Sequence, residues 1–195
     1  RTQTVGLVTP QVEAQASRVK EYMNYLLMEE MEDYTTDMDQ MLFYLPLSGS
    51  TFKKVYYDDL LGRAVSKFVP ADDLVVPYTA TSLDDAESII HVLKMSENDL
   101  RKQQVGGFYN DIDLGSPAIV KNEVDQKERE LEGTKSTGKA ENIYTLLECH
   151  VNLDLEGFED VGKDGQPTGI KLPYVVTIEE GSQKVLSIRR NYAPN

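Results

Sequence analysis

Residues 171–190 read KLPYVVTIEEGSQKVLSIRR. Two β-rich runs, residues 171–178 and 184–190, flank the turn-forming Glu180-Gly181-Ser182. β-Branched and aromatic side chains favour strands, and glycine beside short polar residues favours a tight connection between them. This stretch therefore predicts a β-hairpin, and it places an antiparallel sheet at the C-terminal end of the chain.

Further strands are predicted on the N-terminal side of this hairpin. They cover residues 51–57, 63–69, 74–76, 88–95 and 143–155, and the first strand of the C-terminal hairpin extends over residues 170–178. Residues 51–57 and 63–69 flank the turn-forming residues 58–62 and predict the first hairpin of the chain. Residues 74–76 predict a short buried strand that ends before Pro77, because proline supplies no N–H to a strand ladder.

Helices are predicted where apolar residues recur every three or four positions. Residues 11–33 carry one such stripe, formed by Val12, Ala16, Val19, Met23, Leu26, Leu27 and Met31. Residues 36–45 predict a second helix, capped by Thr36 or Asp37 and ended by Pro46 with Gly49. Its inward residues are Met38, Met41, Leu42 and Leu45. Residues 97–104 predict a third helix, which begins after Ser96 and ends at Gly106-Gly107.

Residues 114–142 differ from the rest, because they are almost entirely polar. They predict an insert made of a solvated helix at residues 121–132 and a loop at 133–138. We expect a flexible lead-in at residues 1–10, one α+β domain at 11–192 and a truncated end at 193–195. The predicted fold class is α+β, with N-terminal helices packed on mostly antiparallel strands.

The charge of the chain excludes some functions. Its 195 residues include 33 acidic and 20 basic side chains, which gives a formal net charge of −13. A surface this acidic repels phosphates, so we expect neither independent nucleic-acid binding nor binding to anionic membranes. A membrane-spanning helix needs about 20 consecutive apolar residues, and the sequence contains no such run. The chain begins without Met or a signal pattern, so we expect it to be part of something longer.

Two stretches approach the phosphate-binding P-loop pattern, residues 133–140 and 157–164. In both, the last position is not Ser or Thr, so the hydroxyl that would hold Mg²⁺ is missing. Asp111 and Asp113 begin like a calcium loop, but the acidic residues required at its later positions are missing. We interpret the two P-loop-like stretches as flexible loops and assign no cofactor or metal.

Cys149 and His150 form the pair that most invites a catalytic hypothesis. Thiolate and imidazole are metal ligands and can act together as nucleophile and base. On a strand, however, Cys149 faces away from Glu148 and His150, so we predict a structural role with Cys149 as a small buried hydrophobe. No catalytic, cofactor-binding or metal residue is assigned, and we expect no enzyme. The alternative is a cryptic hydrolase that uses a carboxylate pair or Cys149 with His150.

The aromatic content leaves two interpretations open. The chain has eleven tyrosines and no tryptophan. Several of them cluster around the predicted first hairpin, at Tyr44, Tyr56 and Tyr57. Tyrosines pack in cores with the hydroxyl at the rim, and they are also enriched where subunits meet.

Several long runs resemble one family. Residues 43–58 read FYLPLSGSTFKKVYYD, and residues 66–78 read SKFVPADDLVVPY. Both are similar to portal proteins of the short-tailed type of tailed bacteriophage. Residues 93–107 and 148–177, including GIKLPY at 169–174, resemble later parts of the same region. The likeness covers most of residues 11–192 and corresponds to the wing-side part that precedes the tunnel-forming helices.

The resemblance implies a structural role. Portal proteins form a ring of about twelve subunits at one vertex of the capsid, and DNA is packaged and ejected through this ring. The ring is also the docking platform for the terminase motor and the tail, so the implied partners are other portal subunits, terminase, capsid and tail proteins. DNA passes non-specifically, no cofactor is implied, and the location is the virion after synthesis in the bacterial cytoplasm. The chain is far shorter than a portal subunit. A second alternative is another virion adaptor or interaction module.

Overall fold

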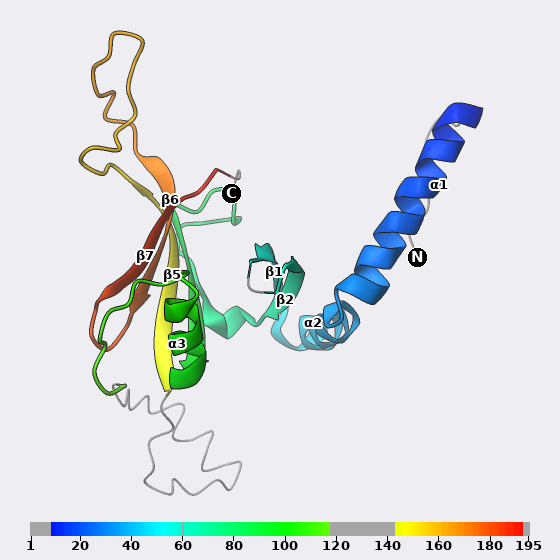
Figure 1. Cartoon of the computed structure of the whole chain (residues 1–195), viewed down its shortest axis with the longest axis horizontal. Coiled ribbons are helices and arrows are strands. Elements are labelled where there is room, and N and C mark those ends of the chain that lie inside the picture. The colour runs from blue at the N-terminus through cyan, green and yellow to red at the C-terminus, as the bar shows by residue number, and fades with distance from the viewer. Residues whose placement is uncertain (1–8, 60, 118–142, 193–195) are drawn as a thin grey trace, which may run out of the picture. The chain divides into compact units, whose positions relative to one another are not determined.

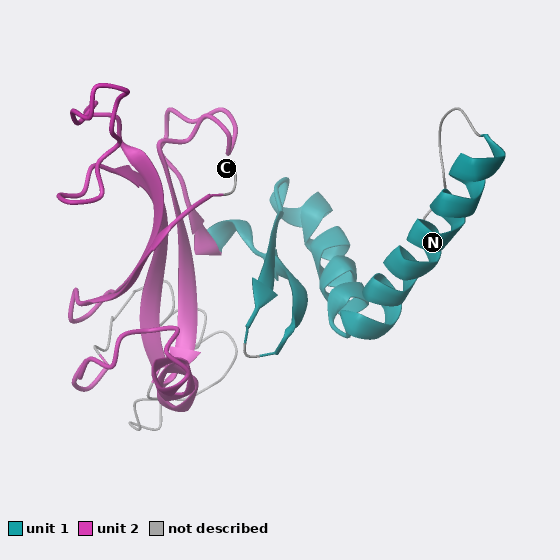
Figure 2. Ribbon diagram, turned by 45° about the horizontal axis from the view of Figure 1, so that its top comes forward, with its two compact units in different colours: residues 1–72 teal, residues 73–195 magenta. Residues whose placement is uncertain are grey.

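The computed structural model describes residues 9–59, 61–117 and 143–192. The chain forms two compact units, residues 1–72 and residues 73–195 (Figure 2). Each unit combines helix with antiparallel strands, so the predicted α+β class is confirmed. The predicted domain at residues 11–192 thus spans parts of both units, which are described separately below.

The first unit begins with a long helical segment. Helix α1, Pro10–Tyr25, continues into a π-helical turn at Leu26–Glu30. The side chain of Thr9 caps α1 by accepting a hydrogen bond from the N–H of Val12 at 3.3 Å. Pro10 suits the first turn of the helix, because an N–H group at that position would have no partner within the helix. The helix therefore begins at Pro10, where a flexible lead-in was predicted to end.

The predicted inward stripe of α1 is not buried in this structure. The exposed fractions of Val12, Val19 and Met23 are 42%, 61% and 40%. A stripe at helical spacing is buried only where another element packs against it, and α1 has no buried residue. Met31, the last residue of the predicted stripe, is 8% exposed, so the stripe is buried at this end and not along α1.

Helix α2, Tyr34–Ser48, differs from its prediction at both ends. The predicted cap Asp37 lies inside the helix, and its carboxylate accepts the backbone N–H of Phe68 at 3.2 Å. Pro46 lies within the last turn and does not end the helix. The helix ends at Gly49, whose φ of +75° suits glycine and whose N–H bonds to the carbonyl oxygen of Leu45 at 3.0 Å.

The predicted first hairpin is confirmed and packs against α2. Strands β1, Phe52–Asp58, and β2, Arg63–Val69, pair from Phe52↔Val69 to Asp58↔Arg63. The ring of Phe68 stacks on that of Tyr44 with centroids 5.5 Å apart. Arg63 donates to the carbonyl oxygen of Glu30 at 2.8 Å, which joins the hairpin to the end of the π-helical turn.

The second unit is built on one antiparallel sheet with the strand order β3-β4-β5-β6-β7 (Figure 1). Its strands are β3 Leu74–Val75, β4 Ser88–Ser96, β5 Ile143–Leu153, β6 Leu172–Glu179 and β7 Val185–Arg190. The predicted strands are all present. The burial predicted for β3 is wrong, because Val75 is 50% exposed. This short strand lies at the sheet edge and pairs only with β4.

The core of the second unit lies between one face of the sheet and helix α3, Glu97–Val105. Ser96 caps α3 by accepting the N–H of Asp99 at 3.2 Å, as predicted for this position. The core side chains come from α3, the segment after it and two strands: Leu100, Tyr109, Tyr144, Leu146 and Leu186. Tyr144 also donates its hydroxyl to the carbonyl oxygen of Gly115 at 2.6 Å.

Several predictions lie outside the described residues. They concern most of the lead-in, the helix at 121–132, the loop at 133–138, the P-loop-like residues 133–140 and the end at 193–195. Within the described parts of the chain, no helix is both long enough and apolar enough to cross a bilayer.

Candidate functional site

A row of polar side chains crosses four strands of the five-stranded sheet. The strand register places His91 opposite Glu148, Glu148 opposite Thr177, and Thr177 opposite Ser187. His150 lies two residues along β5 on the same face, and its Nε2 is 3.1 Å from Oε1 of Glu148. Both histidines of the chain thus lie beside one buried carboxylate, a pairing that only the strand register reveals.

Part of this polar row is a buried hydrogen-bonded pair of hydroxyl groups. Thr177 and Ser187 are 2% and 8% exposed, so a substrate could not reach their hydroxyl groups. Ser187 donates to the hydroxyl oxygen of Thr177 at 3.2 Å and not to an imidazole. Buried polar groups are stable when they bond to one another, and this row provides such bonds without pairing a nucleophile with a base.

The structure does not bring Cys149 and His150 together. Cys149 pairs with Val176 and faces away from the Glu148–His150 pair, as predicted from strand alternation. Burial raises the pKa of the Cys149 thiol, and the negative charge of Glu148 raises this pKa further. A reactive cysteine needs the opposite shift. The side chain is half-buried, which corrects the expectation of full burial.

We predict that Cys149→Ser and His150→Ala leave any function of the chain unchanged once stability is taken into account. The reason is that the thiol and the imidazole lie on opposite faces of β5 and cannot act on one substrate. Thermal unfolding of each variant, compared with its ester and peptide hydrolysis rates, checks this. A hydrolysis rate in the original chain that both variants abolish without unfolding would establish the hydrolase alternative.

The other motifs do not form a site. Among the described side chains, no group of three His, Cys, Asp or Glu could hold a metal ion. Asp111 pairs with Arg101, while Asp113 accepts the N–H of Gly115 at 2.9 Å, so these two carboxylates serve different local contacts. In the P-loop-like residues 157–164, Glu159 accepts the N–H of Gly157 at 2.9 Å. The carboxylate of Glu159 therefore already accepts a hydrogen bond from an N–H group that a bound phosphate would need.

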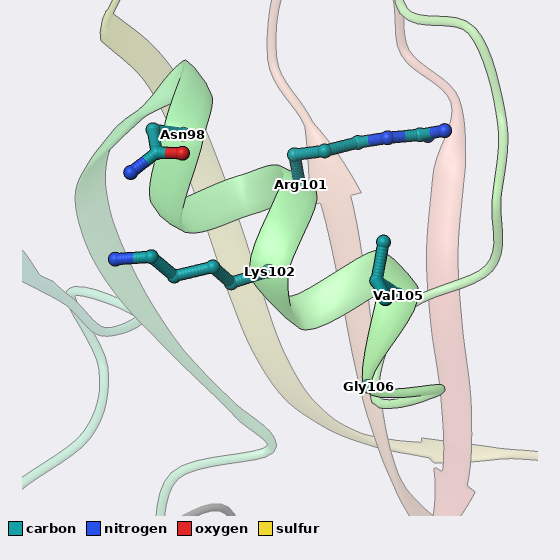
Figure 3. Close-up of a pocket in the computed structure, with 5 residues that line it drawn as sticks. All are labelled: Asn98, Arg101, Lys102, Val105 and Gly106. Carbon is teal, nitrogen blue, oxygen red and sulfur yellow. The ribbon is translucent and has the colours of Figure 1, made fainter.

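An open hollow lies along α3 and is lined by Asn98, Arg101, Lys102, Val105 and Gly106 (Figure 3). The side chains of Arg101 and Lys102 extend in opposite directions from the helix. Each already has an acidic partner, because Arg101 pairs with Asp111 and Lys102 lies 2.9 Å from Asp99. Ligand pockets gather polar groups toward one point, and this hollow does not.

The most distinctive surface of the first unit is apolar. Residues 43–57 of α2 and β1 expose Phe43 (67%), Leu47 (70%), Val55 (69%) and Tyr57 (63%). The sequence could not identify them, because the periodic spacing of apolar residues on a helix or a strand is also typical of buried positions. Large exposed apolar side chains in such numbers are typical of surfaces that other proteins cover.

Some tyrosines pack in the core, and others lie exposed where a subunit contact could form. Tyr109, Tyr144 and Tyr174 are buried in the second unit, whereas Tyr22 and Tyr57 of the first unit are each more than 60% exposed. The buried rings serve as core, and the exposed rings are available for contacts with partners.

Comparison with models of known protein families gives no match, and no curated protein is similar in sequence.

Proposed function

We propose that this chain is a wing-side part of a phage portal subunit, with a structural role in the ring through which DNA is packaged and ejected. One observation carries the proposal. The run that resembles portal proteins, residues 43–58, also exposes several large apolar side chains close together in sequence, including Phe43, Leu47 and Val55. When a neighbouring subunit covers such side chains, their apolar surface leaves water, and this burial stabilises the contact between the subunits.

The remaining partners follow from the same proposal. The ring serves as docking platform for terminase and tail proteins and sits in the capsid of the virion, after synthesis in the bacterial cytoplasm. DNA passes through it non-specifically and needs no cofactor. A net charge of −13 supports this role, because few lysines and arginines are available to hold phosphates during passage.

The location of the protein in the virion tests the proposal. We expect gold-labelled antibodies against this chain to mark one vertex of each opened particle. Label spread over the whole capsid, confined to the tail or absent from particles would contradict it. Label confined to the tail would instead favour the virion adaptor.

A substitution tests the apolar surface itself. We expect Leu47→Asp to reduce the yield of DNA-filled heads by about tenfold or more, because a charge placed at the centre of a subunit contact abolishes much of its binding energy. The count of filled and empty heads in electron micrographs measures this. Asp39→Asn is the matched control, since Asp39 is an exposed polar residue on the same helix. Equal yields for Leu47→Asp and the original protein would show that this surface is not a subunit contact.

A further inference from the structure

In the part of the chain that the structure describes, no strand pairs with the outer edge of β7 along its C-terminal half. In an antiparallel pair, alternate residues turn both backbone groups toward the partner strand and the others turn both away. The N–H of Asn191 bonds to the carbonyl oxygen of Pro173 at 3.0 Å, so the backbone groups of Ile188 and Arg190 point away from β6. Among the described residues, the only backbone bond to this edge is from Asn110 to Leu186, at 2.8 Å.

Arg190 lies at this edge, and none of the described acidic residues forms an ion pair with it. Its guanidinium is 5.2 Å from the ring centroid of Tyr174 and 5.9 Å from that of Tyr192. Within the described residues, its buried Nη1 has no hydrogen-bond acceptor.

The neighbouring Arg189, on the same strand, has both a hydrogen-bond acceptor and an aromatic contact. Its Nη2 donates to the carbonyl oxygen of Phe108 at 2.6 Å, and its guanidinium lies 3.7 Å from the centroid of the Phe108 ring. Arg189 fastens the segment after α3 to the sheet. Arg190, on the opposite face, makes no such bond among the described residues, and its guanidinium lacks the acceptor that a carboxylate would supply.

We infer that this edge binds an extended acidic segment of another protein, which adds a sixth strand beside β7. Its backbone would pair with the outward N–H and C=O groups of Ile188 and Arg190. On the face that carries Arg190, a carboxylate would bond to the guanidinium. Two residues away, an apolar side chain would cover Ile188, which is 51% exposed.

Charge favours an acidic partner over a second copy of the same strand. Antiparallel pairing of two copies of β7 about residue 189 would place Arg189 of one chain opposite Arg189 of the other. Like charges opposite each other destabilise a strand pair, whereas opposite charges stabilise it. The inference is independent of the portal proposal, because it depends only on this edge.

The probe is the capped peptide Thr-Val-Thr-Glu-Thr-Val, whose alternation places valine and glutamate on one face. We expect it to shift the backbone amide NMR signals of Ile188 and Arg190 in the full chain. The same peptide with lysine in place of glutamate should bind about tenfold more weakly, because it loses a charge-assisted hydrogen bond and gains repulsion. Absence of binding by the glutamate peptide at millimolar concentration, or equal binding by both peptides, would overturn the inference.

Two variants separate backbone pairing from charge. Ile188→Pro removes an N–H that β6 does not use, so it should abolish binding while the sheet persists. Arg190→Gln should weaken binding by about tenfold. Lys67→Gln, an exposed lysine of the first unit, is the control for loss of one positive charge and should bind as the original chain does.

Unchanged binding by both β7 variants would overturn the inference. If Ile188→Pro does not fold, the glutamate peptide with N-methyl groups on alternate residues tests the backbone pairing, and its equal binding would overturn it as well. Self-association of the original chain that Ile188→Pro abolishes, without any peptide binding, would show that the edge pairs with a second copy instead.

Discussion

Leu146→Ala is expected to lower the free energy of unfolding of the second unit by about 2–5 kcal/mol. Leu146 is fully buried on β5, and it packs with Leu100 of α3 and Leu186 of β7. Alanine at this position loses apolar contacts. It also leaves a cavity, because the sheet and the helix relax only partially around the smaller side chain. Urea unfolding followed by circular dichroism measures the change.

Leu147→Ala is the matched control for this prediction. Leu147 is the next residue on the same strand, lies on the opposite face and is only partly buried. Its loss should cost about half as much or less, because less of its surface leaves water on folding. Equal costs for the two variants would show that the core is not centred between α3 and this face of the sheet.

Glu179→Ala is expected to lower the free energy of unfolding by about 1.5–3 kcal/mol. Glu179 is 3% exposed, and its carboxylate accepts the backbone N–H groups of Gly181 (3.0 Å) and Ser182. These bonds hold the turn that joins β6 to β7. Removing the carboxylate leaves the two N–H groups of the turn without their acceptor. Urea unfolding again provides the measurement.

Glu180, the next residue along the chain, is the control for this prediction. Glu180 is exposed, and its backbone N–H bonds to the carbonyl oxygen of Thr145 at 2.9 Å. A change of the Glu180 side chain leaves this backbone bond in place. Glu180→Ala should therefore change stability by no more than about 0.5 kcal/mol. Glu179→Gln keeps one acceptor oxygen and should fall between the two. A Glu179→Ala chain as stable as the Glu180→Ala chain would contradict the role assigned to this carboxylate.

Local sequence was sufficient for much of the fold. The two hairpins follow from β-rich runs around turn residues, and the start of α3 follows from the cap at Ser96. Local sequence was misleading at α2, where Asp37 looked like a cap but bonds to the backbone of β2. A carboxylate satisfies whichever N–H lies within reach, and the reach of Asp37 depends on where β2 packs.

The candidate site could be predicted only in part. Alternation along β5 correctly separated Cys149 from His150, since that depends on the geometry of one strand. The approach of His91 to Glu148 depends on the pairing of β4 with β5, which are far apart in sequence. The unpartnered guanidinium of Arg190 likewise depends on what surrounds it in space.

The chain's own residues thus determined its strands, its turns, the cap of α3 and its strong negative charge, because each depends on neighbouring residues or on a simple sum. Only the tertiary structure decided which apolar faces are covered. The stripe of α1 and the core positions of α3 look alike in sequence, yet Val19 is 61% exposed and Leu100 is 4% exposed. Burial depends on the surface that packs against a helix, and periodicity describes only the helix itself.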